Sequence, residues 1–68
     1  MMTLRLVLAI VCGRIQIVDF NAKEPIVFEG DATIENVMGK LTHETLRKRV
    51  KGMWANQNDG TIIISICD

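Results

Sequence analysis

The clearest alternation of apolar and polar positions lies between Val50 and Cys67. Two strand-like runs, 50–55 and 61–67, flank Asn58-Asp59-Gly60, and Asp-Gly between such runs is a strong hairpin signal because Gly adopts positive φ freely. In the second run positions 62, 64 and 66 are all isoleucine, and positions 63, 65 and 67 are Ile, Ser and Cys. Such a strand, apolar on one face and nearly so on the other, belongs in the middle of a sheet, covered on both sides.

The N-terminal segment 3–11 is compatible with two periods. As a helix it is capped by Thr3 and places Leu4, Val7 and Leu8 on one face. As a strand, the Leu and Ile residues at even positions from 4 to 10 alternate with Arg, Val and Ala. We favour the helix and keep the strand as the alternative.

A second, weaker hairpin follows. Residues 14–20 have the pattern of a strand with an irregularity near Asp19, 21–25 form a polar connection, and 26–29 form the next strand, closed by Gly30. Pro25 suits the start of that strand because proline cannot donate a hydrogen bond to a sheet.

Helical spacing returns at Ile34, Val37, Met38 and Leu41, the i, i+3, i+4, i+7 pattern of an amphipathic face. The apolar register then slips by one position before Leu46, which predicts two short helices, about 33–40 and 43–48. The candidate N-caps are Asp31 or Thr33 for the first helix and Thr42 for the second.

These elements predict a single α+β domain spanning residues 1–68. We expect the order α-β-β-α-β-β, with two β-hairpins forming a small antiparallel sheet and one or two short helices packed on a face. If 3–11 is a strand, the order becomes β-β-β-α-β-β, a small roll.

Size argues for self-association. A chain of 68 residues buries only about 60% of its unfolded surface. If 3–11 is a helix, Leu6 and Ile10 face away from Leu4 and Val7, which leaves an apolar strip exposed. We therefore expect a two-fold homodimer.

The net charge is zero, but the charges are segregated along the chain. Such a molecule can pair its acidic region with the basic region of a second copy. The acidic residues between positions 19 and 36 are Asp19, Glu24, Glu29, Asp31 and Glu35, and the basic residues between 40 and 51 are Lys40, Arg47, Lys48, Arg49 and Lys51.

No catalytic constellation, cofactor motif or metal-ligand spacing is present. Cys12 and Cys67 are not part of a Cys-x-x-Cys motif and the lone His43 is far from both in sequence, so we interpret both thiols as small buried hydrophobes. His43 and Glu44 are adjacent and therefore do not face each other on a helix. We expect a protein that is not an enzyme and binds no cofactor or metal.

The N-terminus is a poor targeting signal. The apolar run 6–11 is shorter than the ~7–15 residues of a signal-peptide core, and Val11 stands before Cys12 where lipoprotein cleavage requires a small residue. No segment approaches the ~20 apolar residues of a membrane span. We therefore expect a cytoplasmic protein with reduced thiols and no membrane partner.

The best candidate contact surface is the basic run Arg47, Lys48, Arg49 and Lys51 with Trp54 nearby. Such a surface can bind phosphates and stack a base, although the same cations also suit a solvated helix C-terminus. Trp54 is expected to pack within the C-terminal hairpin.

From Leu4 onward the chain resembles a family of very small proteins encoded in phages and integrative mobile elements of Gram-positive gut bacteria. The segments that carry the resemblance are IQIVDF (15–20), IVFEG (26–30), LRKRV (46–50) and IIISI (62–66). The chain differs from that pattern in a longer stretch between Gly30 and Leu46 and in its basic run. The resemblance implies a mobile-element setting, in which proteins of this size bind and block a host protein, including host defence nucleases.

The leading hypothesis is a small non-enzymatic binding protein of a phage or mobile element, with counter-defence inhibition of the anti-CRISPR type as its specific form. The alternative is a nucleic-acid-binding accessory protein that uses residues 47–51 and Trp54, but the zero net charge leads us to expect no such binding at physiological salt. A second alternative is a self-assembling structural protein.

Overall fold

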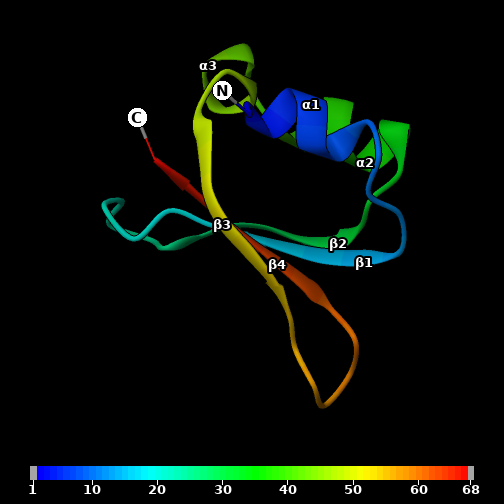
Figure 1. The fold of residues 1–68 in the computed structure, drawn as a ribbon. Helices are drawn as coiled ribbons and strands as arrows, with labels where there is room; N and C mark the ends of the chain where they lie inside the picture. The colour runs from blue at the N-terminus through cyan, green and yellow to red at the C-terminus, as the bar shows by residue number, and fades with distance from the viewer. Residues whose placement is uncertain (1, 68) are drawn as a thin grey trace.

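The computed structural model describes residues 2–67 as one four-stranded sheet with three short helices on one face (Figure 1). This confirms the α+β prediction, with two helices in the middle of the chain. The elements are α1 Leu4–Leu8, β1 Arg14–Val18, β2 Ile26–Asp31, α2 Ile34–Lys40, α3 His43–Leu46, β3 Arg49–Ala55 and β4 Ile62–Cys67.

The strand order is β2-β1-β4-β3. Both predicted hairpins form, β1 with β2 and β3 with β4, and each is antiparallel. The two hairpins meet through β1 and β4, which run parallel from Ile15 opposite Ile62 to Val18 opposite Ser65. The prediction of a purely antiparallel sheet is therefore wrong, because α2 and α3 carry the chain across the sheet and β3 starts at the far edge in the same direction as β2.

Each hairpin contains one irregularity in its register. In the first hairpin the shift lies between Ile17 and Val18, close to the irregularity expected near Asp19. The strand ends there because Asp19 begins a turn: its backbone carbonyl oxygen accepts a hydrogen bond from the Ala22 N–H at 3.1 Å. In the second hairpin the shift lies between Val50 and Gly52.

Each helix is capped by a threonine. Thr3 accepts a hydrogen bond from the Leu6 N–H, and Thr33 and Thr42 accept from residues three positions later. Such caps satisfy donors that the first helical turn leaves unpaired. Residues 4–8 are therefore helical, and the alternative roll with a strand at 3–11 is wrong.

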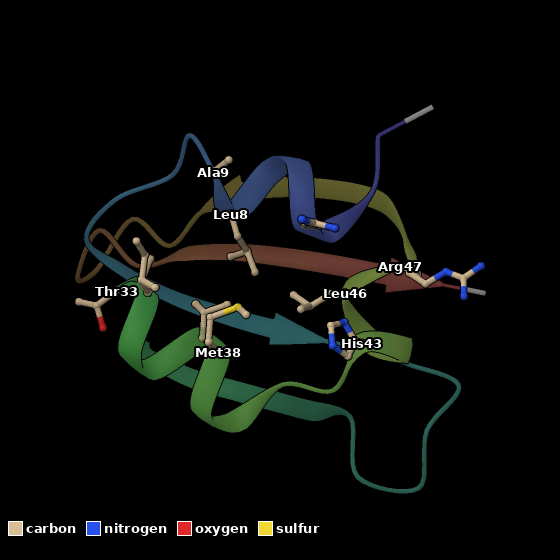
Figure 2. A pocket seen from close by; sticks show the side chains of 11 residues that line it. Leu8, Ala9, Thr33, Met38, His43, Leu46 and Arg47 are labelled. Carbon is tan, nitrogen blue, oxygen red and sulfur yellow. The ribbon is translucent and has the colours of Figure 1, made fainter.

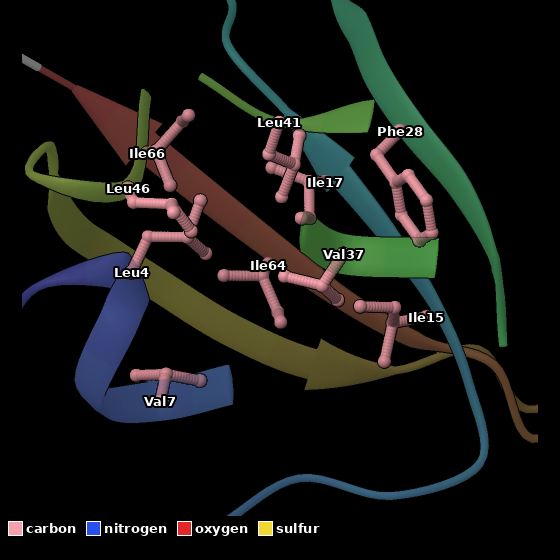
Figure 3. Packing of buried hydrophobic residues seen from close by; sticks show 10 residues of the cluster. All are labelled: Leu4, Val7, Ile15, Ile17, Phe28, Val37, Leu41, Leu46, Ile64 and Ile66. Atoms are coloured by element: carbon pink, nitrogen blue, oxygen red, sulfur yellow. The ribbon is translucent and has the colours of Figure 1, made fainter. Parts of the chain in front are cut away.

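The core lies between the helices and one face of the sheet (Figure 3). Its buried side chains come from all three helices, from the three strands β1, β2 and β4, and from the residue that caps the end of α2; they are Leu4, Val7, Ile15, Ile17, Phe28, Val37, Leu41, Leu46, Ile64 and Ile66. Within residues 2–67 no helix covers the other face (Figure 1). The central position of β4 is confirmed, and its expected covering on both sides is wrong.

Backbone hydrogen bonds join the N-terminal segment to β3 and to the residue before it. The Leu4 N–H donates to the Lys48 carbonyl oxygen at 2.9 Å, and the Val50 N–H donates to the Met2 carbonyl oxygen at 2.9 Å. A bridge between Thr3 and Arg49 completes this short antiparallel pairing. It covers the start of the outer edge of β3, so that α1 begins directly beside the end of α3. Among the described helices, none is long and apolar enough to cross a membrane.

Candidate functional site

The predicted basic run does not form one patch. Arg47 is the C-cap of α3 and lines a groove between the helices. The Lys48 ammonium is held by Asp19, whereas Arg49 and Lys51 belong to the edge strand β3. The run therefore divides between the helix layer, an internal ion pair and the sheet edge.

The ion pair between Asp19 and Lys48 joins the acidic and basic regions within one chain. The Lys48 Nζ donates to Asp19 Oδ2 at 2.9 Å, and the Asn21 N–H donates to Asp19 Oδ1 at 3.0 Å. Asp19 is buried. These hydrogen bonds, with that of Lys48 the larger, hold the pKa of Asp19 below its ordinary value of 3.8.

The other acidic residues lie on the surface. Glu29 in β2 accepts a hydrogen bond from the Gln16 side-chain amide at 2.6 Å and lies 3.7 Å from the Arg14 guanidinium. Glu24, Asp31 and Glu35 are exposed. The acidic set is therefore distributed over the first hairpin and the start of α2, without a single acidic face.

Trp54 lies on the sheet face that no helix covers. It pairs with Ile63, whereas the neighbouring Met53 pairs with Ile64, whose side chain enters the core on the opposite face. The indole passes over Gly52, where an added Cβ would lie 3.7 Å from Trp54 Cζ3. With 47% of its surface exposed, Trp54 is not the packed hairpin residue that the sequence suggested.

The cysteines differ in environment. Both thiols are free, and Cys12 is exposed whereas Cys67 is half-buried. The interpretation of Cys12 as a buried hydrophobe is therefore wrong. His43 and Glu44 are exposed in the first turn of α3. Among residues 2–67, no three or more His, Cys, Asp or Glu residues are grouped so that they could hold a metal ion.

Sequence reasoning missed a groove of about 500 Å³ between α1, α2 and α3. Figure 2 shows Leu8 of α1 and Met38 of α2 pointing into the same space, with His43 and Arg47 at the end where α3 lies. The sequence does reveal the helical spacing of the apolar residues that α2 contributes to the groove, Ile34, Val37 and Met38. It does not reveal the groove itself, because the groove depends on how α1 and α2 lie relative to each other.

Comparisons of the chain with protein-family models, with curated proteins and with solved structures found no match.

Proposed function

We propose that this chain is a non-enzymatic binding protein whose partner is another protein, held against the uncovered sheet face around Trp54. The observation that carries the proposal is the half-exposed indole on a face without helices. Tryptophan is strongly enriched among the side chains that dominate binding energy. The indole lies over Gly52 of the same strand, at ordinary van der Waals distance from where a Cβ would be.

The surroundings of Trp54 support a protein partner over a nucleic acid. Ile63 is its apolar neighbour on β4, and within residues 2–67 no strand pairs with the outer edge of β3 beyond Val50. A partner can therefore contact the indole and also add main-chain hydrogen bonds at that edge. Phosphate binding would need clustered cations, whereas Lys48 is engaged with Asp19 and Arg47 lies in the helix layer.

The biological setting that we propose is the cytoplasm of a bacterial host, with the chain encoded by a phage or mobile element. The support is the resemblance carried by residues 15–20, 26–30, 46–50 and 62–66. In that setting the partner is a host protein such as a defence nuclease, and the chain is a counter-defence inhibitor.

Capture from host lysate tests the proposal. Tagged wild-type protein is compared with Trp54→Ala and with Phe20→Ala, a control that removes an aromatic residue 66% exposed in the turn after β1. We expect one host protein to be retained by wild type and control. Its affinity for Trp54→Ala should fall about thirtyfold, the effect of a loss of about 2 kcal/mol. Equal retention by all three variants, or recovery of nucleic acid alone, contradicts the proposal.

We also propose that the chain forms a two-fold dimer through the outer side of α1. Leu6 and Ile10 are 56% and 74% exposed, whereas Leu4 and Val7 are fully buried, so α1 and the turn that follows it present an apolar strip outward. Light scattering at micromolar concentration should give a mass near twice 7.6 kDa, falling to the monomer in Leu6→Glu. A wild-type mass that stays at one chain as concentration rises contradicts the dimer.

A further inference from the structure

The groove between the helices has an apolar floor. Leu8 of α1, Val37 of α2 and Leu46 of α3 line it, and Val37 and Leu46 also belong to the core, with 8% and 6% of their surfaces exposed. The floor is therefore part of the packed interior. It does not depend on mobile surface side chains for its shape.

One wall of the groove exposes unusually large apolar side chains. Ile34 and Met38 lie one turn apart on α2, are 82% and 61% exposed, and both line the groove. Ala9, just after α1, also lines the groove. The apolar surface of Ile34 and Met38 is left in contact with water, which is unfavourable.

The charged lining of the groove has a single sign. Its charged side chains are those of Arg5 and Arg47, the imidazole of His43 also lines it, and no acidic residue does. Arg5 lies in α1 and Arg47 directly follows α3, and the Leu4 N–H donates to the Lys48 carbonyl oxygen at 2.9 Å, so both arginines belong to the end of the groove where α1 meets α3. Within residues 2–67 neither arginine forms an ion pair.

We propose that this groove binds a straight-chain carboxylate, with the hydrocarbon chain along Leu8, Val37 and Met38 and the carboxylate between Arg5 and Arg47. The volume of about 500 Å³ falls within the ~300–1,000 Å³ of small-molecule sites, which are mostly apolar with a few converging polar groups. Guanidinium groups bind carboxylates with paired hydrogen bonds. The imidazole of His43 adds a further donor at the same end of the groove.

This site shares no residue with the proposed protein-binding face. Trp54 lies on the sheet face opposite the helices, so carboxylate binding in the groove can be measured even if no protein binds at Trp54, and the reverse. A ligand in the groove would also cover Ile34 and Met38, which no described part of the chain covers.

Titration with three probes of equal chain length tests the proposal, each kept below its micelle concentration. The probes are dodecanoate, dodecanol and dodecyltrimethylammonium, and amide chemical shifts report which residues respond. We expect dodecanoate to bind with shifts at Ala9, Ala32 and Met38, and dodecanol to bind at least tenfold more weakly. The cationic probe should bind most weakly. Equal binding of all three, or binding of none, overturns the proposal.

Paired variants locate the site. Arg5→Gln and Arg47→Gln should each weaken dodecanoate binding about tenfold, whereas Lys51→Gln, which removes a cation from β3, should not. Ile34→Gln should weaken binding and Ile26→Gln should not, since Ile26 is also exposed but lies in β2. Amide spectra confirm that each variant is folded. If an acidic amphipathic helical peptide binds the groove and dodecanoate does not, the site is a peptide site and the proposal is wrong.

Discussion

Asp19 and Lys48 are joined side chain to side chain although 29 positions separate them in the sequence. Asp19 follows β1, an inner strand of the sheet, and Lys48 precedes β3 at the edge. The pair therefore holds the connection between α3 and β3 against the end of β1. With Lys48 only partly exposed and Asp19 buried, this contact is shielded from solvent more than a surface ion pair is.

Because of this pair, the stability of the folded chain should depend on pH in the acidic range. The folded pKa of Asp19 lies below 3.8, and that of Asp59 is also lowered, mainly by the hydrogen bond from the Thr61 N–H. Their stabilising contribution is present above pH 3.8 and is lost as pH falls through the folded pKa values. We expect Asp19→Asn to lower the melting temperature at pH 7, with the difference from wild type shrinking below pH 3.8. Glu24→Gln is the matched control, and an equal loss in that variant would contradict a specific role for Asp19.

The centre of the sheet should dominate stability. Ile64 is fully buried in β4, so Ile64→Ala should lower the free energy of unfolding by about 2–5 kcal/mol. Ile34→Ala removes the same atoms from a side chain that is 82% exposed, and it should change stability by about 0.5 kcal/mol or less. Urea unfolding followed by circular dichroism measures both, and similar midpoints for the two variants would show that β4 is peripheral.

Two glycines should respond to alanine with opposite signs. Gly60 closes the C-terminal hairpin with φ of +77°, so Gly60→Ala should destabilise the fold by about 1 kcal/mol. Gly39 lies inside α2 with no atom within 4 Å of an added Cβ, so Gly39→Ala should stabilise by about 0.5–1 kcal/mol. Thermal melts of both variants give the comparison. A loss of stability at Gly39 would indicate that α2 needs the freedom of glycine there.

The features that sequence reasoning predicted are those set by neighbouring residues. Asp59-Gly60 marks a turn through local backbone preference, and Ile34, Val37 and Leu41 mark a helix through their spacing. Each threonine cap is also local, because the threonine bonds a residue only three positions later. Each of these signals fits within a few positions of the chain, which is why both hairpins and all three helices were found.

The features that it missed join distant segments. The parallel pairing of Ile15 with Ile62 depends on which edge of the sheet receives β3, and no turn residue encodes that choice. The groove depends on the gap between α1 and α2, so Arg5 and Met38 had no visible relation in the sequence. Trp54 was misplaced because its exposure depends on whether a helix covers its face of the sheet.

The parallel pairing of β1 with β4 has a kinetic consequence. Each hairpin closes a short loop and can form early, but the two central strands meet only after the whole intervening chain has been brought together. The entropy of closing such a loop is lost before the contacts of Ile15, Ile17 and Ile64 compensate for it. We therefore expect the encounter of the two hairpins to be the slow step of folding, and until it occurs β1 would expose a row of unpaired backbone groups to neighbouring chains.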